Sequence, residues 1–335
     1  MTANKELSAS NPSHPHFVDA LSHQAVYSWS KQGGFASPGL ALSDGVAVVI
    51  SAPALSGRLL DQILRSLSEW VEVEQIASHP LSEVLGDSVV VVQVNDEQQH
   101  LNPARLSNIA AQFHVDIAGV SERPALSEGG LLVMDMDSTI IQIECIDEIA
   151  ALAGLKEQVS AVTEKAMRGE IPFSESLIQR VACLKGVPVS QLASIRDSIP
   201  LMPGLTLLLN TLKAHNWKIA IASGGFTYFA DYLKDRLGLD EAVSNTLGIQ
   251  EDMLTGKVSG AIVDAQVKAD TVKALAQRWH IPAEQTIAMG DGANDLLMMD
   301  AAALGVACHA KPKVTEQADA AIRFGGLHTL LYLLR

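Results

Sequence analysis

The chain has 335 residues, 48% hydrophobic and 19% charged, a composition that suits a folded protein of about two domains and excludes a disordered one. Its formal net charge is -14, with 38 acidic against 24 basic residues, so it lacks the basic footprint of proteins that bind nucleic acid or anionic membranes. We expect neither as a partner, and an anionic substrate would need a local cation.

The cysteines and the N-terminal segment indicate the cellular compartment of the protein. Cys145, Cys183 and Cys308 are odd in number, widely spaced and without a CxxC pair, which is typical of buried thiols in a reducing compartment. The first residues show no secretory pattern, and no apolar run approaches the roughly 18 residues that span a bilayer. We therefore expect a cytoplasmic protein.

The N-terminal part divides into a polar lead-in, residues 1–44, and a small domain, residues 45–121. The lead-in is rich in Ser, His and Pro, and we expect it to pack loosely. The small domain has the element order β-α-β-β-α-β of an α+β, ferredoxin-like or ACT-like unit. Two roles remain open for it: a ligand-sensing module, or a domain that is purely structural or forms a homodimer. Its predicted elements are strands at 45–53, 71–78, 88–94 and 115–120 and helices at 55–70 and 103–114.

After a linker at residues 122–130, rich in Pro, Ser and Gly, the pattern becomes α/β from 131 to 335. Short apolar strands alternate with helices, which predicts a parallel sheet covered on both faces. Three strands end in polar corners, "LLVMDMD", "KIAIASGG" and "TIAMGDG", and the carboxyl ends of such strands meet at one edge, so the corners should form one site. Three further segments are a fourth strand, "LGVAC", a helical cap at about 145–200 and a hairpin at 245–263.

The first corner carries two carboxylates that we expect to act together. Asp135 and Asp137 lie two residues apart in extended chain, so they point to the same side. Unpaired, they would repel each other, whereas one Mg²⁺ shared by Asp135 and Asp291 of the third corner would keep Asp135 ionised. Beside a bound phosphate, Asp135 is a candidate nucleophile that forms an aspartyl-phosphate, and Asp137 is a candidate general acid and base.

The remaining polar residues of the corners suit a phosphate. Ser138 and Thr139 would offer a hydroxyl and backbone N–H groups to it. Ser223 and the glycines after it allow close backbone approach. Lys268, near a predicted helix start, would neutralise developing charge. Each feature alone is common on protein surfaces, but their order and positions favour a catalytic site.

These features resemble the four motifs of the haloacid dehalogenase (HAD) superfamily in its aspartate-nucleophile phosphatase form. The matching segments are "DMDST", "SGG", Lys268 and "GDGAND", and the resemblance covers the chain from Leu131 to about Phe324. The resemblance implies a HAD-type Rossmannoid sheet with a helical cap and a Mg²⁺-dependent hydrolase.

The cap should select the substrate. Glu144 can pair with an ammonium and Arg180 can clamp a carboxylate, which together with a phosphate site describes a phosphorylated amino acid. On its own, either residue is better explained as a helix cap or a solvated side chain. With "ECIDEIA" and "SLIQRVACLKG" added, the motifs resemble the phosphoserine phosphatase family in its bacterial form with an extra N-terminal domain.

That family resemblance implies roles residue by residue and an activity, the hydrolysis of O-phospho-L-serine in serine biosynthesis. Asp135 would be the nucleophile and Asp137 the acid and base. One Mg²⁺ would lie between Asp135, the Asp137 backbone carbonyl and Asp291. The expected substrate ligands are Glu144 for the amino group, Arg180 for the carboxylate, Phe173 over the substrate, Ser223, Gly224 and Lys268 for the phosphate, and Asn294, with Ser138, Thr139 and Asp295 in support.

Three alternatives stay open at this point. The first is a HAD phosphatase or phosphotransferase for another small phosphate, such as phosphohomoserine or phosphothreonine. The second is a non-enzymatic receiver, against which Asp137 argues because it is poised to activate water. The third is an amino-acid sensor whose working part is the N-terminal domain.

Overall fold

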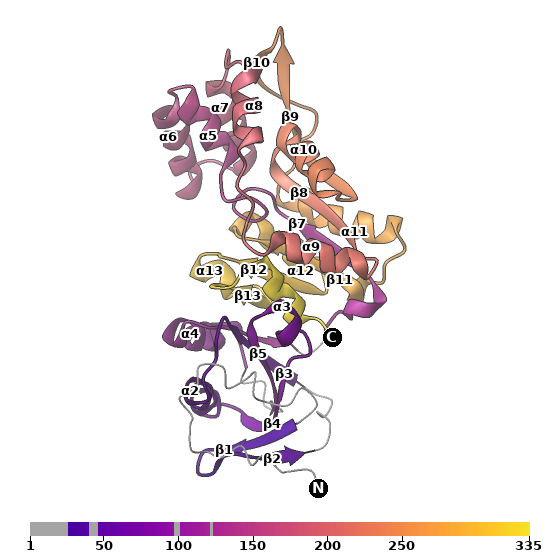
Figure 1. Ribbon diagram of the computed structural model, residues 1–335. Helices are drawn as coiled ribbons and strands as arrows, with labels where there is room; N and C mark the ends of the chain where they lie inside the picture. The colour runs from indigo at the N-terminus through magenta and orange to yellow at the C-terminus, as the bar shows by residue number, and fades with distance from the viewer. Residues whose placement is uncertain (1–25, 40–45, 97–100, 121–122) are drawn as a thin grey trace. The chain divides into compact units, whose positions relative to one another are not determined.

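The computed structural model describes residues 26–39, 46–96, 101–120 and 123–335, and the chain separates into two compact units (Figure 1). One unit combines Met1–Arg123 with His309–Arg335, and the other is Pro124–Cys308. This division differs from the expected domain at 131–335 in the last 27 residues, which cluster with the N-terminal part.

The first unit is built on an antiparallel sheet with the strand order β2-β1-β4-β5-β3-β6. Helices α2 and α4 share one hydrophobic core with this sheet. Together with the strands β3 to β6 they confirm the predicted β-α-β-β-α-β order, to which the structure adds the short helix α3. The elements are β1 (Val26–Ser30), β2 (Gly34–Gly39), β3 (Val46–Ala52), α2 (Gly57–Leu67), β4 (Glu72–Ser78), α3 (Ser82–Leu85), β5 (Ser88–Asn95), α4 (Pro103–Phe113), β6 (Asp116–Val120), α13 (Pro312–Thr315), β13 (Ala320–Ile322) and the 3-10 helix η4 (Leu327–Leu333).

The predicted lead-in contributes β1 and β2 to this sheet, which corrects its description as loosely packed over residues 26–39. β1 pairs with β4, and its Trp29 is buried in the core, where the indole N–H donates to Asp61 at 2.9 Å. The rest of the lead-in, residues 1–25 and 40–44, lies outside the described residues.

A buried carboxylate explains why the C-terminal segment belongs to the first unit. Asp116, at the start of β6, accepts backbone N–H groups from Arg323 at 2.6 Å and from Gly325 at 2.7 Å. Asp87 accepts from the Tyr332 hydroxyl at 3.0 Å, and Tyr332 is fully buried. Buried polar groups are costly unless they are hydrogen-bonded, so these bonds fix the segment to its own unit.

The second unit is an α/β domain whose strands follow the order β10-β9-β8-β7-β11-β12. The strands β9, β8, β7, β11 and β12 run parallel, as predicted, and β10 returns antiparallel to β9. Its elements are η1 (Leu126–Glu128), β7 (Leu131–Met134), α5 (Cys145–Leu152), α6 (Lys156–Met167), α7 (Phe173–Cys183), α8 (Val189–Asp197), α9 (Leu205–Ala214), β8 (Lys218–Phe226), α10 (Thr227–Leu237), β9 (Glu241–Gln250), β10 (Met253–Ser259), α11 (Ala265–Arg278), η2 (Ala283–Gln285), β11 (Thr286–Gly290), η3 (Ala293–Asp295), α12 (Leu296–Asp300) and β12 (Leu304–Cys308).

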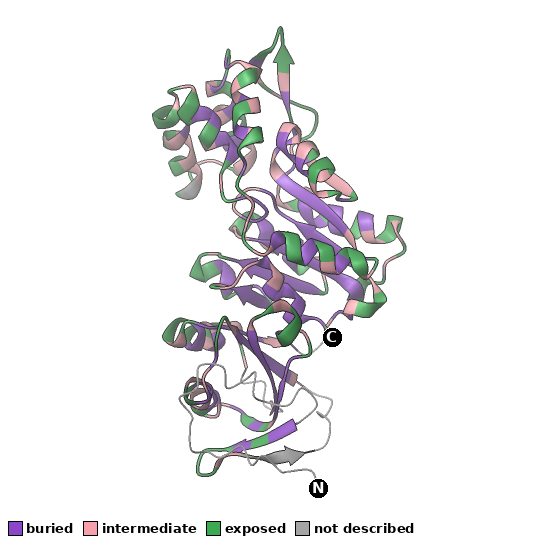
Figure 2. Ribbon diagram, in the orientation of Figure 1, coloured by how far each residue is buried: buried purple, intermediate pink, exposed green. Residues whose placement is uncertain are grey.

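The strands β7, β11 and β12 are mostly apolar and buried at every position, as expected for parallel strands covered on both faces (Figure 2). Leu131, Val133 and Ala220 pack with Val272 of α11 and Met298 of α12 on one face, and α9 and α10 contact β8. The core thus holds β7, β8 and β11 in register, with Met134 opposite both Ile221 and Met289.

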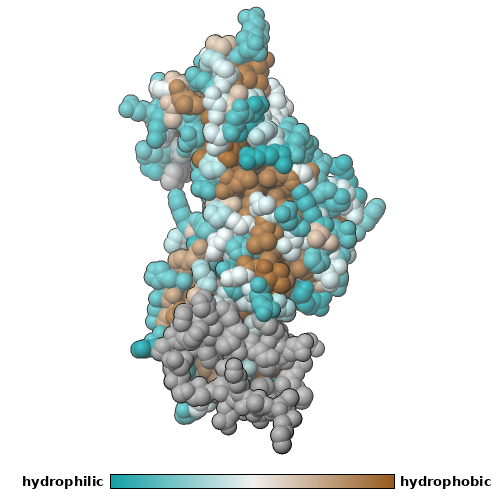
Figure 3. All heavy atoms as spheres, in the orientation of Figure 1, coloured by the Kyte–Doolittle hydropathy of each residue, from teal (hydrophilic) through white to brown (hydrophobic). Residues whose placement is uncertain are grey.

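Helices α5 to α8 form the predicted cap, and β9 with β10 forms the predicted hairpin (Figure 1). The face of the molecule in Figure 3 is mainly hydrophilic, with apolar patches between. Among the described residues, no helix is both long and apolar enough to cross a membrane.

Candidate active site

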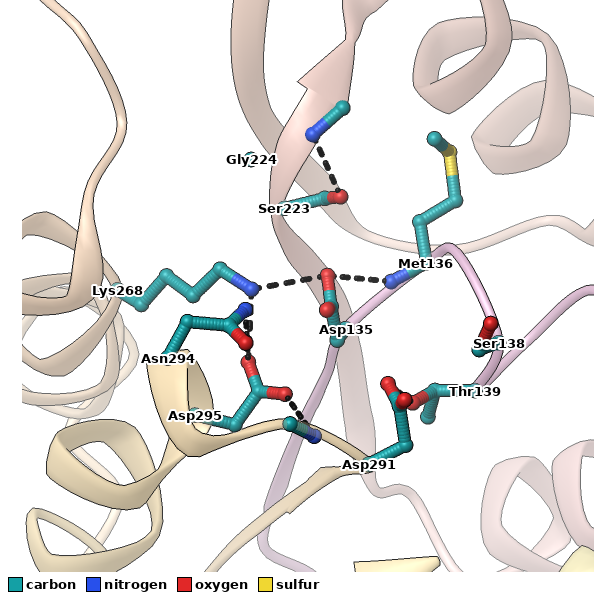
Figure 4. Close-up of polar contacts among 12 residues, drawn as sticks. Asp135, Met136, Ser138, Thr139, Ser223, Gly224, Lys268, Asp291, Asn294 and Asp295 are labelled. Carbon is teal, nitrogen blue, oxygen red and sulfur yellow. Dashed lines mark hydrogen bonds and ion pairs between the residues drawn. The ribbon is translucent and has the colours of Figure 1, made fainter. Parts of the chain in front are cut away.

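Three strand ends bring the predicted polar corners together (Figure 4). Asp135 follows β7, Asp291 follows β11, and Ser223 lies near the end of β8, and β7 lies between β8 and β11 in the sheet. The Asp135 backbone N–H donates to Met289 at 2.9 Å, which continues the pairing of β7 with β11 past the last strand residue. The sheet register therefore places the three side chains at one edge.

Lys268 lies within a cluster of buried carboxylates. Its ammonium is 3.0 Å from Asp135 Oδ1 and 2.7 Å from Asp295 Oδ1, and its side chain is only 2% exposed. Burial alone would lower the pKa of Lys268, but the charges of Asp135 and Asp295 raise it above its ordinary value. Lys268 is therefore a permanent buried cation beside Asp135.

The cluster still carries more negative than positive charge. Asp135, Asp291 and Asp295 each offer a carboxylate oxygen within 4.8 Å of the others. Burial, and then the charges of Asp135 and Asp295, raise the pKa of Asp291 to about 7. An all-oxygen donor set of this kind fits a hard divalent cation, which would relieve the repulsion. Asp295 also accepts from the Gly292 N–H at 3.0 Å, so its two oxygens are already engaged.

Asp137 is half-buried at the cavity, in surroundings that suit a proton donor. Its Oδ1 is buried and has no hydrogen-bond partner within the described part of the chain. Burial, followed by the charges of Glu144 and Asp135, raises the pKa of Asp137 well above its ordinary value. Burial and these two charges therefore favour the protonated form of this carboxyl.

The loop after Asp137 places two hydroxyls next to carboxylates of the site. Ser138 has a left-handed backbone with φ +57° and donates its hydroxyl to Glu144 Oε1 at 2.7 Å. Thr139 is fully buried and donates to Asp291 Oδ1 at 3.3 Å. Both hydroxyls orient carboxylates of the site, because a carboxylate is a strong acceptor.

The second corner is held by a residue that sequence reasoning missed. Asn245 of β9 is buried, donates to the Gly224 carbonyl at 2.8 Å and accepts the Val263 N–H at 2.8 Å. Ser223 Oγ accepts the Gly225 N–H at 3.0 Å. No local motif marks Asn245, because its partners lie 21 and 18 residues away in the chain.

The cap closes a small cavity over these corners. It has a volume of about 180 Å³, below the roughly 300 Å³ of the smallest drug-sized pockets. The Phe173 ring packs on Gly224, where a Cβ atom would lie 2.8 Å from Cζ. The predicted residues that line the cavity are Asp135, Asp137, Glu144, Phe173, Arg180, Ser223, Gly224, Asp291 and Asn294, and the unpredicted ones are Ile146, Leu177, Gly225 and Phe226.

Two cap residues give the cavity opposite charges. Burial raises the pKa of Glu144, and the hydrogen bond from Ser138 opposes this shift. Arg180 stays charged, although burial lowers its pKa, and its buried Nε has no partner among the described residues. An unpaired buried guanidinium N–H is costly, and an anionic ligand would satisfy it.

Comparison with known proteins gives consistent matches. Residues 130–303 match the haloacid dehalogenase-like hydrolase family. The chain is 58% identical over 220 residues to a phosphoserine phosphatase of Haemophilus influenzae, covering 66% of this chain and 70% of that protein. It is similar to the crystal structure of a probable phosphoserine phosphatase from Vibrio cholerae, with TM-score 0.71, 43% identity and 86% of each chain covered. It is also similar to a phosphoserine phosphatase structure that contains a phospho-aspartyl intermediate analogue, with TM-score 0.59, 36% identity and coverage of 62% of this chain and all of that one.

Proposed function

The chain belongs to the haloacid dehalogenase-like hydrolases, and from that membership we propose that it is a phosphoserine phosphatase. It hydrolyses O-phospho-L-serine to L-serine and phosphate, the last step of serine biosynthesis. The observation that carries the proposal is one small cavity whose lining includes Asp135, the Ser223–Gly224 corner, Glu144 and Arg180. A nucleophile, a phosphate corner, an acid and a guanidinium together suit a phosphorylated amino acid.

The reaction takes place in two displacements at phosphorus. A carboxylate oxygen of Asp135 attacks the phosphorus, and the bond from phosphorus to the serine oxygen breaks as Asp137 gives that oxygen its proton. Water then attacks the phosphorus of phospho-Asp135, Asp137 takes a proton from the water, and phosphate leaves as Asp135 is regenerated. The raised pKa of Asp137 supports its role as proton donor in the first displacement.

The remaining residues bind and orient the substrate. Ser223, Gly224 and Lys268 contact the phosphate, with Asn294 assisting, and Lys268 neutralises charge that develops on the phosphoryl oxygens. Glu144 pairs with the substrate ammonium, and Arg180 pairs with its carboxylate. Phe173 covers the cavity and excludes water while the substrate is bound.

One Mg²⁺ per site fits the carboxylate cluster. Asp135, the Asp137 backbone carbonyl and Asp291 would hold it, whereas Asp295 supports Lys268 through their 2.7 Å contact. When bound, the ion supplies Lewis-acid stabilisation of phosphoryl charge.

The proposal extends to the setting of the enzyme. The enzyme binds its small-molecule substrate, it binds neither nucleic acid nor membranes, and it acts in the cytoplasm. The N-terminal domain, residues 45–121, forms a homodimer, which a sedimentation measurement on the full chain would test.

Phosphate release from a panel of phosphorylated amino acids, with Mg²⁺ and with a chelator, tests the assigned activity. We expect phosphoserine to be hydrolysed fastest and only with the metal, because the cavity has little room for a longer side chain. Faster phosphate release from phosphothreonine or phosphohomoserine than from phosphoserine would identify that compound as the substrate. Phosphate release that is stoichiometric with the protein and does not continue into turnover would identify the protein as a non-enzymatic receiver instead.

A further inference from the structure

The β9–β10 hairpin is bound to the cap by main-chain pairing. The Gly186 N–H donates to Leu254 O at 2.8 Å, the Leu254 N–H donates to Val187 O at 2.9 Å, and the Val189 N–H donates to Asp252 O at 2.9 Å. Residues 186–189 between α7 and α8 thus pair antiparallel with residues 252–254, with Pro188 opposite Met253. Figure 1 shows the hairpin reaching α7 and α8, beyond the sheet it extends.

Gly256 lets β10 touch the end of helix α7. A Cβ atom on Gly256 would lie 2.9 Å from Lys185 Cβ and 3.3 Å from Ala182 O. Carbon atoms in ordinary contact are about 3.5 Å or more apart, so a side chain there would push the helix end away by about half an ångström. Leu254 and Val187 are buried beside this contact, which makes the joint rigid.

Helix α7 carries Arg180 and begins at Phe173, so the position of the hairpin sets the position of both side chains. The Arg180 Nε has no partner within the described residues. The place of the guanidinium therefore depends on the helix backbone.

We propose that the β9–β10 hairpin is part of the substrate-selecting lid, with Gly256 as a positioning residue that sets the distance between Arg180 and the substrate carboxylate. The main-chain hydrogen bonds between the hairpin and the cap persist throughout turnover, so the two move together as one rigid body. This inference rests on the proposed function, because it gives Arg180 the substrate carboxylate as its partner.

The chain offers a matched pair of glycines for the test. Gly256 and Gly260 have φ +74° and +82°, so alanine is equally strained at both, but a Cβ on Gly260 meets nothing within 4 Å. We expect Gly256→Ala to raise KM for phosphoserine about tenfold, since misplacement by 1 Å can cost about a hundredfold. Its KM for phosphoethanolamine, which lacks the carboxylate, should rise clearly less than its KM for phosphoserine, and the kinetics of Gly260→Ala should stay within about twofold of wild type on both substrates.

Two outcomes would overturn the inference: equal loss by Gly256→Ala on both substrates, or equal effects of the two alanine variants on phosphoserine. A wild-type protein inactive on phosphoserine would instead remove the proposed function itself.

A disulfide tests the same joint in a protein that keeps Gly256. Pro188 and Met253 are antiparallel partners, whose Cα atoms lie about 4.5–5.5 Å apart, within the roughly 4.4–6.8 Å of a disulfide. The variant Pro188→Cys/Met253→Cys, oxidised, should keep its phosphoserine activity within about twofold, with each single variant treated alike as the control. Loss of activity on oxidation that a reductant restores would show that hairpin and cap must separate, and would overturn the one-body lid.

Discussion

Replacing Lys268 by methionine removes the buried cation of the carboxylate cluster while keeping the length of the side chain. Its partners Asp135 and Asp295 are 8% and 0% exposed at their side chains, so water cannot replace the lost charge. Removing one partner of a buried pair costs about 3–5 kcal/mol. At about 2–4 °C per kcal/mol for a domain of this size, Tm should fall by about 6–20 °C in a chelator. Saturating Mg²⁺ should reduce that loss, because it supplies positive charge to the same carboxylates.

The same variant should lower kcat by about 10²–10³, the usual effect of losing one donor to developing charge. Lys273→Met, an exposed position on the same helix, is the matched control and should change neither quantity. Thermal unfolding with and without chelator, together with steady-state phosphate release, measures both effects. A kcat near wild type, or a Tm shift equal to that of Lys273→Met in chelator, would refute the assigned role of Lys268.

Three further predictions test other parts of the site. Asp135→Asn should lower turnover by about 10⁴-fold or more with an unchanged circular dichroism spectrum; substantial activity at saturating Mg²⁺ would rule out Asp135 as nucleophile. Arg180→Ala removes charge-assisted hydrogen bonds and should reduce kcat/KM for phosphoserine about 10- to 100-fold but hardly affect an aryl phosphate, whereas equal losses would make Arg180 structural. Burial and its acidic neighbours raise the pKa of Asp291 to about 7, so the metal-free native state holds an extra proton between about pH 4 and 7, and Tm in chelator should fall as pH rises through that window. Mg²⁺ binding displaces this proton and should weaken below about pH 7; an Asp291→Asn variant with the same pH slope would contradict this origin.

The site could be predicted largely from sequence because its residues follow apolar strands. A run such as "LLVMDMD" marks a buried strand and its end, and parallel strands end at the same edge. Once the strands were identified, their common edge predicted that Asp135, Ser223 and Asp291 lie close together. The hydrogen bonds that the Ser138 and Thr139 hydroxyls make could not be predicted, because they depend on the distances to Glu144 and Asp291, which the sequence does not provide.

Features set by distant contacts left no local pattern. The strand at Val26–Ser30 is short and follows a polar segment, and its pairing with β2 and β4 and the burial of Trp29 stabilise it. The C-terminal segment joins the first unit through Asp116, more than 200 residues earlier in the chain. A lysine near a helix start is ordinarily exposed, and Lys268 is buried because Asp295, 27 residues on, pairs with it.

Chemical trapping of the intermediate tests the central claim most directly. Wild-type protein mixed with phosphoserine and Mg²⁺, quenched during turnover and reduced with borohydride, should yield a peptide with homoserine at position 135, since borohydride reduces an acyl phosphate to the alcohol. Phosphate release with Asp135 left unmodified, or homoserine at another aspartate, would contradict attack by Asp135 on phosphorus.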